Sequence, residues 1–137
     1  MKKTTLDIEQ MKHLQDLGLD TSNASAYWYR IVQHKSSGVS ACMRVISDWK
    51  RAFSLNIACC TGHTIESIPA FTLDEVLELL PKKMSCYSLT ITSIGGKWYI
   101  SYTCNNRPMQ VIVKAYLIDA AYEVLCWVIE NGYLKVE

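Results

Sequence analysis

The sequence holds one group of side chains that resembles a set of metal ligands, namely Cys59, Cys60 and His63. Thiolate sulfur and imidazole nitrogen bind zinc, and His13 or His34 could complete such a set. A structural zinc site needs four ligands at familiar spacings, however, and adjacent cysteines project differently along a strand. We therefore predict no metal and no cofactor, and interpret these residues as ordinary strand and loop residues.

Three carboxylates could support acid-base chemistry. Asp119, Glu123 and Glu130 fall within about 40° of one another if the segment around them is helical. A solvated polar helix face is the ordinary explanation for such a stripe. No spacing pairs a cysteine nucleophile with a histidine base, and Gly95-Gly96 fits a hairpin turn rather than a phosphate loop. The sequence thus predicts a protein that is not an enzyme and has no catalytic residues. A small enzyme whose site the sequence does not reveal is a further alternative, and it would require a concave site with convergent titratable groups.

One segment mixes cations with aromatic rings in a way that suits nucleic acid. Lys50 and Arg51 lie beside Trp49 and Phe53, so this stretch could contact phosphates and stack on bases. The whole chain has 14 Lys and Arg against 13 Asp and Glu, a net charge of +1. Such a charge does not attract nucleic acid by itself, so any binding needs a local patch.

A second possible nucleic-acid surface is the hydroxyl-rich face of a predicted sheet that carries Tyr99 and Lys114. A continuous positive stripe including Lys97, Arg107 and Lys114 would favour a module that binds single-stranded nucleic acid. The solvent face of a sheet is commonly built from Thr, Ser, Tyr and Lys, because these residues tolerate strands and water together. Nucleic-acid binding is therefore our alternative hypothesis.

Aromatic residues favour a different class of partner. Tyr27, Trp28 and Tyr29 crowd both faces of one short strand, and such residues are enriched at protein interfaces, although packing against a helix explains them equally well. Since no catalytic constellation is present, our leading hypothesis is a non-enzymatic protein-interaction module, with a homodimer as one form of it. An exposed apolar patch would support this hypothesis.

The first half of the chain predicts one helix and two antiparallel strands. The helix covers 7–17, with Thr4 or Thr5 as its N-cap and Gly18 as its end, where Leu19 would pack in a Schellman motif. The strands cover 26–33 and 39–46. Between 47 and 67 the pattern leaves two alternatives open, a strand at 55–60 and a helical turn at 48–53.

The second half is easier to interpret. Thr72 and Glu75 predict a capping box at the start of a helix. Two runs, 86–94 and 97–104, flank Gly95-Gly96 as a hairpin, and a two-residue loop pairs Ile91 with Ile100 on an apolar face and Thr90 with Ser101 on a hydroxyl face.

A third strand and a last helix complete the second half of the chain. The strand should continue the apolar face with Met109, Val111 and Val113, and the polar face with Gln110 and Lys114. A helix at 117–131 ends the pattern. The expected fold is α+β, an antiparallel sheet with helices on one face, in the order αββ, an uncertain segment, then αβββα.

Composition agrees with one domain over residues 1–137. Half of the residues are hydrophobic and a fifth are charged, which is a globular composition, and no apolar run is long enough to span a bilayer. The charged residues that follow the N-terminal lysines interrupt any export signal, so we expect a cytoplasmic protein without membrane contact. Its six cysteines should then be thiols: Cys42, Cys59, Cys60, Cys86, Cys104 and Cys126.

Three groups of segments resemble a family of small uncharacterised proteins encoded by phages and integrated elements of gut anaerobic bacteria. They are Leu17-Gly18-Leu19-Asp20-Thr21-Ser22; Pro69-Ala70-Phe71-Thr72-Leu73 with Leu79-Leu80-Pro81; and Leu117-Ile118-Asp119-Ala120-Ala121-Tyr122 with Cys126-Trp127 and Asn131-Gly132-Tyr133. The stretch 34–62 departs from the pattern. These positions are helix caps, helix ends and core residues, so the resemblance implies a shared fold. It also implies the setting of a mobile-element accessory protein, but the family has no assigned activity that the resemblance could imply for this chain.

Overall fold

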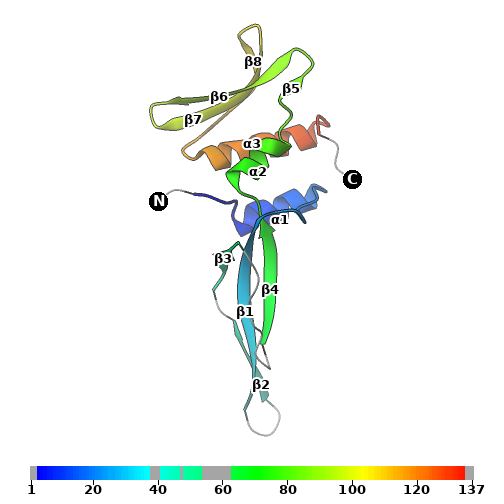
Figure 1. Cartoon of the computed structure of the whole chain (residues 1–137), viewed down its shortest axis with the longest axis vertical. Helices are drawn as coiled ribbons and strands as arrows, with labels where there is room; N and C mark the ends of the chain where they lie inside the picture. Colours follow the sequence, from blue (N-terminus) through cyan, green and yellow to red (C-terminus); the bar gives the residue numbers. More distant parts are fainter. Residues whose placement is uncertain (1–2, 38–40, 47, 54–62, 135–137) are drawn as a thin grey trace.

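Three helices and two four-stranded antiparallel sheets make up the part of the chain described by the structure, a computed structural model. It describes residues 3–37, 41–46, 48–53 and 63–134, with the backbone alone at 33–37, 41–46 and 63–64. The helices form a layer between the sheets, and the first sheet projects from that layer as a long ribbon (Figure 1). The predicted α+β class is confirmed, whereas the division of the strands into two separate sheets was not expected.

Helix α1 (Ile8–Asp16) is capped by Asp7, and not by Thr4 or Thr5 as the sequence suggested. The Asp7 carboxylate accepts a hydrogen bond from the Gln10 amide at 2.8 Å, while the Gln10 side chain accepts one from the Asp7 amide, which completes a capping box. At the other end Gly18 has a φ of +92°, and the Leu19 amide donates to the Leu14 carbonyl at 3.1 Å. The predicted Schellman closure is therefore confirmed.

Strand β1 (Ala26–Ser37) is the centre of the first sheet. It pairs with β2 (Ala41–Ile46) and β3 (Lys50–Ala52) on one side and with β4 (His63–Ala70) on the other, always antiparallel. At about 3.3 Å per residue its 12 residues span roughly 40 Å, which explains the projecting ribbon.

Two predictions in this region are corrected. Strand β1 extends four residues past the predicted end at 33, because its polar continuation pairs with β2. The segment 48–53 contains strand β3 and not a helical turn, whereas the alternative at 55–60 lies outside the described residues.

Helix α2 (Leu73–Leu79) begins at the predicted capping box. Thr72 accepts from the Glu75 amide, and the Glu75 carboxylate accepts from the Thr72 amide at 2.9 Å. Phe71 and Val76 are both buried on either side of this cap, as a hydrophobic staple requires. The start of α2 is thus fixed by local sequence.

The second sheet contains β5 (Lys83–Met84), β6 (Tyr87–Ile94), β7 (Lys97–Cys104) and β8 (Arg107–Lys114), in that spatial order. The predicted hairpin register is confirmed, with Ile91 opposite Ile100 and Thr90 opposite Ser101. Gly95 and Gly96 have φ angles of +60° and +79°, the combination that a tight hairpin turn requires.

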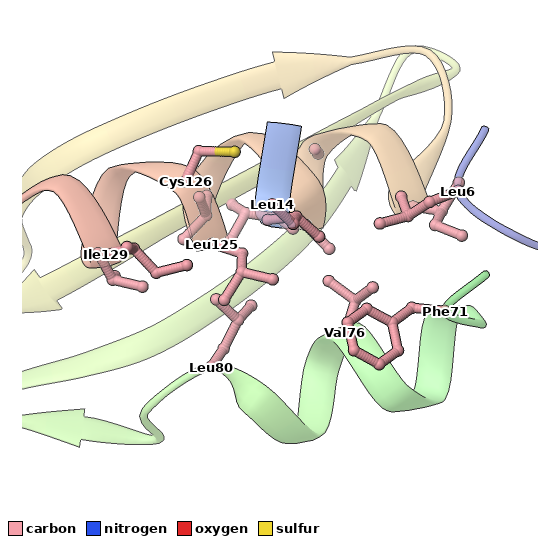
Figure 2. Close-up of a cluster of buried hydrophobic side chains, with 14 of the residues drawn as sticks. Leu6, Leu14, Phe71, Val76, Leu80, Leu125, Cys126 and Ile129 are labelled. Atoms are coloured by element: carbon pink, nitrogen blue, oxygen red, sulfur yellow. The ribbon is translucent and has the colours of Figure 1, made fainter. Parts of the chain in front are cut away.

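The hydrophobic core lies between the helices and one face of the second sheet. Helix α3 (Leu117–Glu130) contributes more buried residues than any other element, and Ile100 and Tyr102 of β7 belong to the same buried cluster. Figure 2 shows Leu14, Val76 and Leu125, one from each helix, within this cluster. The hydroxyl face of the second sheet therefore lies on the side away from the helices.

A β-bulge in β8 contradicts the predicted faces of that strand. Ser101 is opposite Val111 but Thr103 is opposite Pro108, so the two residues Met109 and Gln110 share the place opposite the single residue Tyr102. The extra residue shifts the alternation by one position.

As a result, Met109 lies on the core side as predicted, but the other face assignments are reversed. Val111 and Val113 lie beside Ser101 and Tyr99 on the hydroxyl face, and Lys114 lies on the helix side.

Candidate interaction surface

Of the residues considered as metal ligands from the sequence, His13 alone has a side chain that the structure describes. Cys59 and Cys60, and the side chains of His34 and His63, lie outside what the structure describes. Among the described residues no group of three His, Cys, Asp or Glu side chains could hold a metal ion. The cysteines that the structure describes are free thiols, as predicted: Cys86, Cys104 and Cys126.

Asp119 of the acidic stripe fastens the N-terminal segment and α1 to α3. Its carboxylate accepts hydrogen bonds from the Lys3 ammonium at 2.6 Å and from the Gln10 amide at 2.9 Å. Burial alone would raise the pKa of Asp119, but these two donors together lower it below its usual value. The carboxylate is therefore held as an anion by its structural partners.

The other two acidic residues of the stripe also face basic side chains from other elements. Glu123 lies 3.3 Å from the ammonium of Lys114 on β8, and Glu130 lies 3.9 Å from an imidazole nitrogen of His13 on α1. The stripe was expected to be a solvated face. Glu123 and Glu130 do remain exposed, at 44% and 54% of their side chains, but the stripe also forms a seam of polar contacts between α3, α1 and β8.

A hollow of about 290 Å³ adjoins this seam, and it collects the titratable groups that an enzyme would need. It is lined by His13, Glu130, Tyr122 and Cys126, among others. Burial raises the pKa of Cys126 to about 11 and also raises that of Tyr122. Both groups stay protonated at neutral pH, so Cys126 is a packed thiol here and not a thiolate nucleophile.

The three basic residues proposed as a nucleic-acid stripe do not lie together on the open sheet face. Lys97 lies on that face, but Lys114 pairs with Glu123 on the helix side. Arg107 is opposite Cys104, at the far end of the hairpin from Lys97 and on the other side of the sheet. These three residues therefore do not form the continuous positive stripe that would favour nucleic-acid binding on this face.

The second nucleic-acid candidate, around Trp49, lies at the base of the ribbon. The Arg30 guanidinium stacks over the Trp49 ring at 4.5 Å and also pairs with Glu66 at 2.6 Å. Arg51 donates to the Thr4 hydroxyl. Two cations of this region, Arg30 and Arg51, thus have structural partners, although Phe53 remains largely exposed.

The face of the second sheet away from the helices is the most distinctive surface that we find. We define the open face as the outward residues of β6, β7 and β8. It combines hydroxyls with exposed apolar side chains, including Ile94 at 61%, Val111 at 46% and Val113 at 39% exposure. Tyr99 lies directly opposite Val113 in the register. Val111 and Val113, with Tyr99 beside them, therefore form an apolar strip on a surface that alternation alone predicted to be polar.

The strip lies at an open edge of the sheet. In the part of the chain that the structure describes, β8 has β7 as its one neighbouring strand. Hydrogen-bonding groups alternate sides along an antiparallel strand, and Ile112 and Lys114 direct theirs toward β7. Val111 and Val113 consequently direct their backbone N–H and C=O groups outward, away from the sheet.

The sheet itself carries charge of one sign, although Glu123 of α3 lies beside Lys114 at the β8 edge. Residues 82–114, which include the entire second sheet, contain five basic residues and no Asp or Glu: Lys82, Lys83, Lys97, Arg107 and Lys114. The helices supply the acidic residues that offset them in the total charge of +1. The near-neutral chain therefore has a local excess of positive charge in the sheet.

Comparison with known proteins gives no match to any family model, to any curated protein or to any solved structure. The resemblance inferred from the sequence segments therefore stays a prediction. Among the described residues, no helix has the length and the apolar character needed to cross a membrane.

Sequence reasoning missed the valines of the interaction surface. It assigned Val111 and Val113 to the core, since they continue the alternation from Met109. The bulge that moves both valines to the open face leaves only a weak signal in the sequence, because Gln110 by itself does not interrupt the alternation. Pro108, which suits an edge strand, is the one residue that could have indicated it.

Proposed function

We propose that this protein is a non-enzymatic interaction module that binds another protein through the open face and the β8 edge of its second sheet. The observation that carries the proposal is the exposure of Val111 and Val113 on an edge strand whose neighbour Ile112 faces the core. Exposed apolar side chains and unpaired strand groups in one place favour association with another polypeptide.

The proposed setting is the bacterial cytoplasm, with the protein acting as an accessory of a phage or integrated element. This part of the proposal is supported by the resemblance of the capping and core segments alone. The proposed partner is a protein, because the open face carries apolar side chains where a nucleic-acid surface would need a row of cations.

The test is affinity capture by the tagged chain from a nuclease-treated lysate of the cells that encode it. The test variant is Val111→Lys with Val113→Lys, which places two charges on the strip. The matched control is Asn23→Lys with Ser67→Lys, two exposed positions elsewhere that add the same charge.

The proposal expects a stoichiometric protein that wild type and control retain and the test variant loses. Retention of that protein by all three chains would contradict the proposal. Recovery of nuclease-sensitive material alone would favour the nucleic-acid alternative instead.

A further inference from the structure

The outer edge of β8 is protected along its first half and open along its second. Pro108 occupies a position whose backbone nitrogen faces outward, because the flanking pair Cys104 and Arg107 directs its groups inward across the turn. Proline has no N–H to offer there, and the bulge follows at once. Such features block unwanted strand pairing on natural sheet edges. Val111 and Val113 form the section without this protection.

Resting on the proposed function above, we propose that this section binds an extended, acidic segment of the partner protein, which adds as a fifth strand beside β8. In such strand addition, backbone hydrogen bonds supply affinity and alternate side chains supply specificity. The outward N–H and C=O groups of Val111 and Val113 are the hydrogen-bonding groups that the added strand would use.

The two sides of β8 define the sequence pattern of the added strand. On the open face, Val111 and Val113 offer apolar contact to side chains of the same kind. On the opposite side, near the two ends of β8, lie exposed Arg107 and Lys114, the second of which already pairs with Glu123 of α3. A segment that alternates apolar with acidic residues matches both sides at once, since successive residues of a strand face opposite ways.

The charge of the second sheet favours an acidic segment over a second copy of this chain as the strand that pairs with β8. Residues 82–114 have five basic side chains and no acidic ones, so a dimer joined at the two β8 edges brings two positively charged sheets together. An acidic strand meets the same surface with opposite charge.

The probe is a short capped peptide in which Val and Glu alternate. Wild type and the matched variant Val113→Thr should bind it alike in isothermal titration calorimetry, because Thr keeps the backbone N–H. Val113→Pro removes that N–H without removing a bond to β7, and should bind about tenfold more weakly or not at all. A Val and Lys peptide and a block-ordered peptide of the same composition should not bind.

A second measurement uses the wild-type chain and does not depend on the folding of the proline variant. Amide hydrogen exchange at Val111 and Val113 should slow when the Val and Glu peptide is added, while Ile112, already paired with β7, should change little. The proposal is overturned by no binding, by equal binding of the Val and Lys peptide, or by unchanged exchange at both valines.

Two results separate this inference from the proposed function. If the peptide fails but Val111→Lys with Val113→Lys still abolishes capture of a partner, the interaction stands and strand addition is wrong. A concentration-dependent dimer in sedimentation that Val113→Pro removes would overturn the acidic segment in favour of a second copy.

Discussion

Replacing Asp119 by asparagine should weaken the attachment of the N-terminal segment to α3 in a pH-dependent way. The Asp119 carboxylate accepts from Lys3 at 2.6 Å and from Gln10 at 2.9 Å, and asparagine keeps the shape but loses the charge. Hydrogen bonds to a charged group are worth roughly 1 kcal/mol more than neutral ones. With 24% of both the Asp119 and Lys3 side chains exposed, water screens part of this gain. We expect a net loss of about 1 kcal/mol at neutral pH.

Thermal unfolding followed by circular dichroism measures this loss. For a chain of this size about 1 kcal/mol corresponds to roughly 3 to 5 °C in Tm. Because the native pKa of Asp119 lies below 3.8, the ordinary value for an aspartate, its contribution is complete above that ordinary value and is lost as the pH falls through the native pKa. The difference in Tm between wild type and Asp119→Asn should therefore shrink as the pH is lowered from about 7 to about 3.

The control is Glu78→Gln, an exposed position on α2, which should change Tm little at any pH. A Tm difference for Asp119→Asn that stays constant across the pH series would refute the assigned role of the carboxylate charge.

Three further results follow from single contacts. Thr72→Ala removes the cap of α2 and should cost about 1 kcal/mol in urea unfolding, with a cost near zero contradicting the capping box. Tyr102→Phe loses the 2.8 Å hydrogen bond from the phenol to the Pro81 carbonyl and should also cost about 1 kcal/mol, whereas a stabilised variant would show that this bond contributes nothing. Cys126, buried and with a pKa raised to about 11, should resist iodoacetamide at neutral pH while exposed Cys86 is alkylated; mass spectrometry showing the opposite order would contradict the burial.

Local sequence signals predicted the parts of the fold that depend on neighbouring residues. The capping box of Thr72 and Glu75 and the turn at Gly95-Gly96 involve residues a few positions apart, so their chemistry is visible in the sequence. The same holds for Gly18 at the end of α1. Each of these features sets a boundary or a register without help from distant segments.

Pairing between distant segments decided the rest. The polar stretch after residue 33 has the composition of a loop, but it continues β1 because β2 pairs with it. The bulge in β8 likewise adds one residue opposite Tyr102, and no local signal at Met109 or Gln110 required it. Since the bulge turns Val111 and Val113 outward, the candidate surface could not be derived from alternation.

Hydrogen exchange of the purified complex with the captured protein tests the central claim most directly. The account predicts that partner binding slows backbone exchange along β8, at residues 111–114, with smaller changes along the paired strand β7. Unchanged exchange in β8 together with slowed exchange in the first sheet or on the helices would place the interface elsewhere and contradict the account.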